Sequence, residues 1–261
     1  MNLSYEFTLN IVQFMAVMSR MFGLFMGFPF FRGQSIPRKT KFAIILMSSV
    51  VILPSLPESW SSENMIHHLD IFGLFLLLMN DLILGLTVSL AISTLLEVGN
   101  LAGQFLSTNM GFSMSTQIDP GSETQSASIS VMFMQMFLVL FLAYDMHLGF
   151  IRIAVQSFSV IEPGQNILTP DHLSTIIDIG SIVFVYALQI STPIIAVMLL
   201  INTAMGVISR FGQDFQVLMI SFPLRLGLGL MMLIVMMPVF TSFFMDLHIE
   251  ILDKFGLILD L

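Results

Sequence analysis

The stretch GQFLSTNMGFSMSTQIDPGSETQSASIS, residues Gly103–Ser130, differs in composition from the sequence on either side of it. It is rich in Ser, Thr, Gln and Asn, holds three glycines and one proline, and contains neither Lys nor Arg. Leu, Ile, Val, Met and Phe dominate both flanks. Backbone that is not helical persists at membrane depth only where protein buries it or where it lines a wet cavity. We therefore interpret this stretch as a pore or cavity element that hydrophobic segments hold in place.

The composition of the chain indicates an integral membrane protein. Its 261 residues are 56% hydrophobic and only 10% charged, and the mean hydropathy is +0.93. A soluble domain has about 25% charged residues. Because there is no cysteine, disulfides and thiolate metal sites are excluded. The net charge of −8 is spread without an acidic tail, and no basic footprint for nucleic acid is present.

The hydrophobic pattern predicts an all-α membrane protein with about six proline-broken helical segments, since a helix needs about 20 apolar residues to cross a bilayer. These segments are residues 9–31, 42–56, 69–96, 131–160, 176–208 and 217–244. Gly23 and Gly27, and again Gly99 and Gly103, have the spacing that permits close helix contact. Residues 246–261 have the apolar spacing of an amphipathic helix that lies against a partner protein or the membrane interface.

Charge placement gives a first prediction of topology. The connection Arg32–Lys41 holds four of the nine basic residues, so the positive-inside rule places it in the cytoplasm. The acidic, polar loop Glu58–Asp70 then lies on the opposite side. Five charges fall inside hydrophobic segments: Arg20, Asp81, Asp145, Arg152 and Arg225. Such charges need a partner or a wet cavity. We expect them to pair with each other or with other subunits rather than to form a proton or ion relay.

Catalysis finds little support in the sequence. Gly111–Ser115 lacks the last glycine of the GxSxG nucleophile motif. The GxxxxGK[ST] phosphate-binding loop is not present, because Arg38 stands directly before Lys39 where that motif has a glycine. We therefore expect neither an enzyme nor a cofactor.

Bulky apolar residues within the polar stretch suggest a gate. Phe105, Met110, Phe112 and Met114 are interleaved with Ser, Thr and Asn. Such residues can close a narrow path by excluding water. The alternative is that they anchor the loop against helices, and the sequence leaves both open.

Several motifs resemble the FliR family of flagellar export-gate proteins, which includes counterparts in virulence type III secretion systems. The resemblance spans about residues 15–238. It rests on Asn109–Ser113 with Asp119–Ser122, on Ile36–Lys41, on Asp145–His147, and on Asn202–Arg210 with Gln213 and Ser221–Leu224.

This resemblance implies a subunit of a helical export-gate complex in the bacterial inner membrane, within the flagellar basal body. Its partners would be FliP-like and FliQ-like subunits, a FlhB-like switch subunit and unfolded exported proteins. The expected parts are a FliP-like part at residues 1–125, a middle helical part at 126–175, a FliQ-like hairpin at 176–245 and the amphipathic tail at 246–261.

The resemblance also implies site residues. Residues 103–122 would form the plug of the channel, and glycines 103, 111 and 121 would serve as its hinges. The plug would contain Gly103, Met110, Gly111, Phe112, Met114, Asp119, Pro120 and Gly121. Contacts with other subunits and with the cytoplasmic entrance would involve Arg210, Gln213, Pro223, Arg38 and Lys39.

Three other functions stay open at this point. The chain could belong to a virulence secretion system, since the motifs are shared. It could be a stand-alone ion-coupled transporter that uses Asp81, Asp145 and Arg152. It could also be a scaffold that nucleates gate assembly and never gates.

Overall fold

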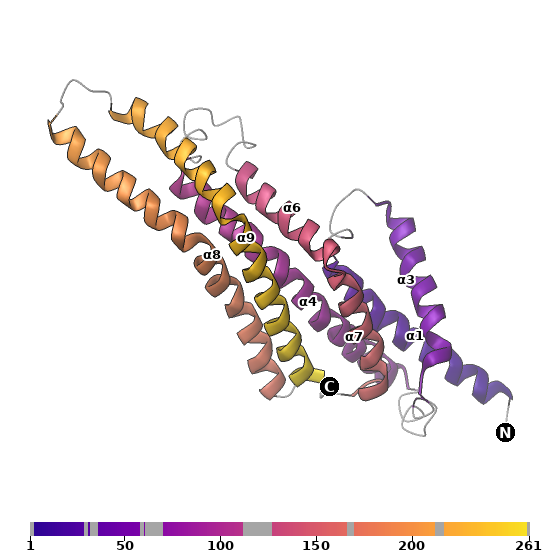
Figure 1. Cartoon of the computed structure of the whole chain (residues 1–261). Coiled ribbons are helices and arrows are strands. Elements are labelled where there is room, and N and C mark those ends of the chain that lie inside the picture. Colours follow the sequence, from indigo (N-terminus) through magenta and orange to yellow (C-terminus); the bar gives the residue numbers. More distant parts are fainter. Residues whose placement is uncertain are drawn as a thin grey trace. The chain divides into compact units, whose positions relative to one another are not determined.

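The computed structural model describes residues 3–28, 31, 36–57, 60, 70–111, 127–165, 170–211 and 217–259, and these form helices and the turns between them (Figure 1). The prediction of an all-α membrane protein is confirmed. The elements in chain order are α1 (Leu3–Gly27), α3 (Arg38–Ile52), the 3-10 helix η1 (Leu53–Ser55), α4 (Ile71–Asn109), α6 (Ala127–Ala143), α7 (Met146–Val160), α8 (Pro170–Phe211) and α9 (Val217–Leu259).

Four of these helices are long and apolar enough to cross a membrane. The candidate spans are Leu9–Gly27, Ile71–Asn109, Ile176–Arg210 and Ser221–Lys254. Helices α6 and α7 pass the same test as a broken pair. Helix α3 has only 15 residues, which is about 22 Å against about 30 Å of hydrocarbon. The six expected segments thus become four spans, one broken pair and one short helix.

The expected segment 131–160 is divided into α6 and α7 by a break at the polar residues after Ala143. Tyr144 and Asp145 form a turn there. Asp145 has φ 53°, which is a left-handed conformation that few non-glycine residues adopt. The helix restarts at Met146.

Helix α4 does not end at Glu97 as predicted, but continues through the start of the polar stretch to Asn109. Its polar side chains lie on one side of the helix and bond along it. Asn100 Nδ2 donates to Glu97 Oε1 at 2.9 Å, Gln104 Nε2 to Asn100 Oδ1 at 3.3 Å, and Thr108 Oγ1 to the Gln104 carbonyl at 2.9 Å. Because bonds at this spacing support a helix, residues 103–109 of the predicted plug loop are helical.

Helix α9 is longer than predicted as well. It runs without a break to Leu259, so the residues after 245 continue this helix instead of forming a separate amphipathic one. Helices α8 and α9 are joined where the Tyr186 hydroxyl donates to Glu250 Oε2 at 2.6 Å. The four-part division by family resemblance stays a prediction.

The chain folds into two compact units. The first comprises Met1–Ser93, Tyr144–Ile179 and Ile251–Leu261, and the second comprises Thr94–Ala143 and Gly180–Glu250. Helices α4, α8 and α9 therefore each contribute residues to both units.

In the first unit, glycines bring α1 into close contact with α4. A Cβ on Gly23 would lie 2.5 Å from the Leu82 carbonyl oxygen, and one on Gly85 would overlap the backbone of Arg20. Gly27 is equally close to Ser89. Gly23 and Gly27 therefore make the close helix contact that their spacing permits.

In the second unit, α6 packs against both α4 and α9. A Cβ on Gly99 would meet the ring of Phe137, and one on Gly103 would lie 2.5 Å from the Cα of Ser130. Gly99 and Gly103 thus also allow a close helix contact, here between α4 and α6. On the α9 side, Phe133 stacks edge-on with Phe240 and Phe137 with Phe244, with ring centroids 5.4 and 5.0 Å apart.

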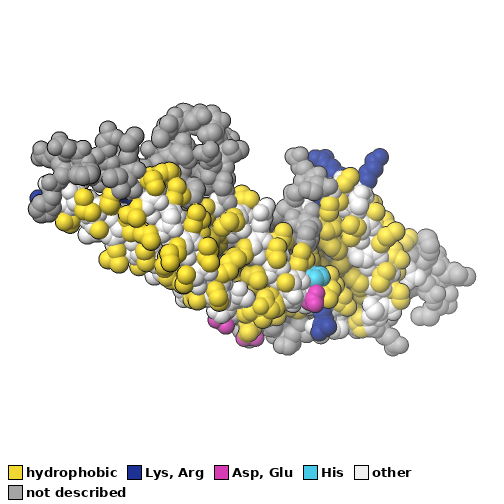
Figure 2. Space-filling view, turned by 45° about the horizontal axis from the view of Figure 1, so that its top comes forward, with side chains coloured by type: hydrophobic (Ala, Val, Ile, Leu, Met, Phe, Trp, Pro, Cys, Tyr) yellow, Lys and Arg dark blue, Asp and Glu magenta, His cyan; other side chains and the backbone are white. Residues whose placement is uncertain are grey.

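Hydrophobic side chains cover much of the face in view in Figure 2. Large apolar side chains are exposed on several helices, including Val51 of α3 at 75%, Ile71 of α4 at 91% and Ile234 of α9 at 76%. Monomeric soluble proteins rarely expose so much contiguous apolar surface. This surface suits lipid or neighbouring subunits.

Candidate functional site

The polar segment leaves α4 through a tight turn at Met110 and Gly111. The Met110 amide donates to the Leu106 carbonyl at 2.9 Å, and the Gly111 amide to the Thr108 carbonyl at 3.3 Å. Gly111 has φ 88°, which residues with a side chain rarely adopt. A glycine at this position therefore allows the helix to end and the chain to change direction.

The side chain of Met110 is fully buried against α9. A Cβ added to Gly229 would lie 3.0 Å from both Cγ and Sδ of Met110, so the missing side chain leaves the space that Met110 fills. Next to it, Gly111 lies against the ring of Phe222. A Cβ placed on Gly111 would lie 3.8 Å from a ring carbon of Phe222. Met110 has no exposed surface at all. This geometry favours the anchoring alternative for Met110 and fixes the start of the polar segment on α9.

Gly103 was predicted to be a hinge of the plug, but the structure places it within a helix. It lies inside α4 and its close neighbours are Ile129, Ser130 and Phe133 of α6. Both helices continue past this contact, so Gly103 serves helix packing here, and its role as a hinge stays a prediction.

The other predicted site residues divide into two groups. The described ones are exposed: Arg38 and Lys39 begin α3, Arg210 is in the last turn of α8, and Pro223 lies inside α9. The predictions for Phe112, Met114, Asp119, Pro120, Gly121 and Gln213 lie outside the described residues.

A buried ion pair joins α1 to α4 in the first unit. Arg20 is 2% exposed and Asp81 is fully buried. Arg20 Nε donates to Asp81 Oδ1 at 2.9 Å, and Arg20 Nη2 bonds the same oxygen. Arg20 Nη1 donates to the carbonyl of Ser157 on α7 at 3.0 Å. The expectation that buried charges pair with each other is confirmed for these two.

Aromatic rings enclose the guanidinium of Arg20. Its carbon lies 4.5 Å from the ring centre of Phe158 and 5.3 Å from that of Trp60. Trp60 Nε1 in turn donates to the Phe158 carbonyl at 2.7 Å, and Gln13 Nε2 donates to the Trp60 carbonyl at 3.0 Å. Arg20 therefore links α1, α4, α7 and the turn at Trp60 through hydrogen bonds and cation–π contacts.

The remaining charges inside hydrophobic segments are arranged differently. Asp145 and Arg152 are exposed, and Arg225 is half-buried with its Nε unpaired among the described residues. An ion path through Asp81, Asp145 and Arg152 would need a group that exchanges protons or ions. Asp81 is instead held by Arg20 in the buried ion pair.

Two important residues were not singled out from the sequence. Gly229 lies in an apolar helix. The one feature of the sequence that could have pointed to it is a glycine inside a long apolar run. Trp60 lies in a stretch that was interpreted as an exposed loop, but it is 1% exposed. The feature that could have pointed to Trp60 is that it is the single tryptophan of the chain.

Comparison with known proteins gives a family match. Residues 11–250 match the model of a family described as "Bacterial export proteins, family 1". The chain is 28% identical over 237 residues to the flagellar biosynthetic protein FliR of Escherichia coli K12, covering 90% of this chain and 87% of that protein. It is 26% identical over 229 residues to the FliR of Bacillus subtilis, covering 87% and 86%. It is 22% identical over 241 residues to the FliR of Caulobacter vibrioides, covering 92% and 94%.

Proposed function

We propose a function for the chain from one premise: it belongs to family 1 of the bacterial export proteins. Its relatives are flagellar biosynthetic proteins that align along nearly their whole length. The chain is accordingly a membrane component of the flagellar apparatus with a role in protein export. More specifically, it is a core subunit of the export gate in the inner membrane, and it forms and plugs the channel for unfolded substrate proteins.

The match across residues 11–250 is the observation that carries this proposal. The geometry adds support for a plug that is anchored at one end. Met110 and Gly111 hold the start of the polar segment on α9. In this proposal the plug opens when substrate enters, and Phe112 and Met114 help to exclude water and ions at rest.

The partners in this proposal are FliP-like and FliQ-like subunits and a FlhB-like switch subunit. The extensive apolar surface of α8 and α9 supports subunit contacts, since it includes exposed Leu200, Met231 and Ile234. Arg210, Gln213 and Pro223 face the cytoplasmic entrance, and Arg38 and Lys39 lie on the cytoplasmic side. The chain has no catalytic activity of its own, and export energy comes from other components.

The alternatives receive less support. The relatives named above are flagellar, which favours a flagellum over a virulence system. A stand-alone transporter would need Asp81 to bind the coupling ion, but Asp81 is paired with Arg20. A scaffold that never gates remains the main competitor.

Deletion of residues 110–117 tests the plug. The assembled complex is reconstituted in liposomes and its ion conductance is measured with and without the deletion. We expect a clear rise in conductance, because the water-excluding residues are gone while the helices remain. The matched control is Gly227→Ala on α9, where an added Cβ meets nothing within 4 Å. Unchanged conductance in a complex that assembles normally would favour the scaffold.

A further inference from the structure

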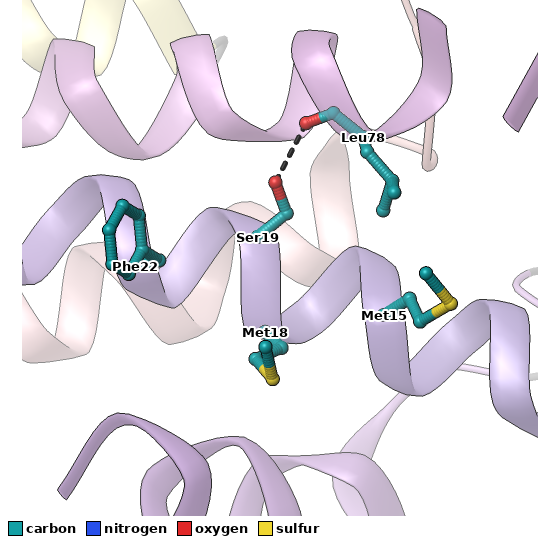
Figure 3. A pocket seen from close by; sticks show the side chains of 5 residues that line it. All are labelled: Met15, Met18, Ser19, Phe22 and Leu78. Atoms are coloured by element: carbon teal, nitrogen blue, oxygen red, sulfur yellow. Dashed lines mark hydrogen bonds between the residues drawn. The ribbon is translucent and has the colours of Figure 1, made fainter. Parts of the chain in front are cut away.

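Two apolar grooves follow one side of α1 in the first unit, and they share Phe22. The first has a volume of about 260 Å³ and is shown in Figure 3, where Met15, Met18 and Phe22 project from α1 while Ser19 bonds the Leu78 carbonyl at 2.7 Å. The second has a volume of about 180 Å³ and is lined by Phe22, Phe25, Met26, Phe31, Lys41 and Ile45. We call the two grooves together the α1 groove; its lining residues extend from Met15 to Lys41.

The length of the α1 groove fits one leaflet of a bilayer. Between Met15 and Met26 the helix rises about 16 Å, and one leaflet of a hydrocarbon core is about 15 Å deep. Three of the lining residues on α1 are methionines. Methionine is flexible and adapts to irregular apolar shapes, so the groove suits an acyl chain.

Positive charge gathers at one end of this groove. Arg38 and Lys39 begin α3 and are exposed. Lys41 lines the groove itself, with its Nζ donating to the Phe31 carbonyl at 2.6 Å. Helix α3 contains no acidic residue, and within the described part of the chain neither Arg38 nor Lys39 forms an ion pair. Figure 2 shows Lys and Arg side chains projecting beyond the hydrophobic surface.

Helix α3 has the surface expected of a helix within one leaflet. Only Ile45, Ser49 and Ile52 are buried along it, whereas Met47 and Val51 are 68% and 75% exposed. The helix is also too short to cross a whole bilayer. Its apolar sides therefore lie in hydrocarbon while its basic end reaches the headgroup level.

We infer that the α1 groove and the basic end of α3 bind an anionic phospholipid. One acyl chain lies in the groove along Met26, Phe22 and Met18. The phosphate is held by Arg38 and Lys39, with Lys41 at the mouth of the groove. Charge complementarity selects an anionic headgroup over a zwitterionic one, and the groove adds the apolar contact that a free phosphate would lack. This binding site is independent of the gate function proposed above.

Spin-label EPR on the full chain reconstituted in phosphatidylcholine tests this inference. Spin-labelled phosphatidylglycerol and phosphatidylcholine are compared at low salt, and the motionally restricted fraction of each is measured. We expect a preference for phosphatidylglycerol in the unaltered protein. Arg38→Gln/Lys39→Gln should remove most of that preference, because each basic residue near the membrane surface contributes about 1 kcal/mol, or about fivefold. Met26→Trp should lower it too, because the indole would fill the groove from an exposed position.

Two control variants keep the test specific. Arg152→Gln removes an exposed basic residue of α7 that lines neither groove, and Met231→Trp adds the same indole at an exposed methionine of α9. Both should keep the preference. Equal restriction of the two lipids by the unaltered protein, or loss of preference in the controls as well, would overturn the inference. So would an unchanged preference in Arg38→Gln/Lys39→Gln.

Discussion

Replacing Gly229 with alanine should push Met110 out of its position on α9. The new methyl group would lie 3.0 Å from Cγ and Sδ of Met110 and still closer to its Cε. Met110 has no exposed surface, so its side chain must shift within a packed environment. Overpacking of this kind costs about 1–3 kcal/mol. The change from glycine to alanine inside a helix returns up to about 1 kcal/mol.

Gly227→Ala separates these two effects. Gly227 lies on the same helix, and a Cβ there meets nothing within 4 Å. It should therefore show only the gain in helix propensity. We expect Gly229→Ala to be less stable than Gly227→Ala by about 1–3 kcal/mol. The measurement is unfolding of the purified protein by SDS in mixed micelles, followed by far-UV circular dichroism.

A double-mutant cycle with Met110→Ala identifies the contact. Met110→Ala alone should cost about 2–5 kcal/mol as a cavity in the core. Adding Gly229→Ala to it should then cost nothing further, because the methyl group occupies vacated space. Strictly additive effects, or equal stability of Gly229→Ala and Gly227→Ala, would refute the packing argument. In the assembled complex, Gly229→Ala should also raise ion conductance if Met110 anchors the plug.

The remaining predictions concern the first unit. Asp81→Leu leaves Arg20 buried without its partner and should cost about 3–5 kcal/mol, whereas Arg20→Met/Asp81→Leu should cost much less; equal losses in the SDS assay would contradict this. Trp60, as the single tryptophan at 1% exposure, should emit at short wavelength and resist acrylamide quenching; strong quenching of the native protein would place it in solvent. Gly85→Ala should cost about 1–3 kcal/mol, because a Cβ would overlap the Arg20 backbone, while Gly180→Ala meets nothing within 4 Å and should be neutral or stabilising.

Hydrophobic pattern and glycine spacing predicted most of the helices. The Gly23–Gly27 and Gly99–Gly103 pairs have the spacing that permits close helix contact, and both pairs make such contacts. The break after Ala143 was also visible as a polar interruption. Glycine spacing and a polar interruption are local patterns, so a single sequence shows them, although it does not name the partner helix.

Features that depend on distant partners were harder to predict. Residues 97–109 look polar enough for a loop, yet they form helix, because Asn100 and Gln104 bond along one side while Ala102 and Leu106 are buried on the other. The pairing of Arg20 with Asp81 was expected only as one possibility among five charges. That Gly229 provides the space for Met110 depends on tertiary packing between residues far apart in sequence, and nothing local indicates it.

Native mass spectrometry tests the central claim most directly. The tagged chain is co-expressed with its neighbouring genes and purified in mild detergent. The account predicts one copy of this chain held with several copies of two other small membrane proteins, as expected for an export-gate subunit. A monomer or homodimer that is stable alone and free of such partners would contradict the account.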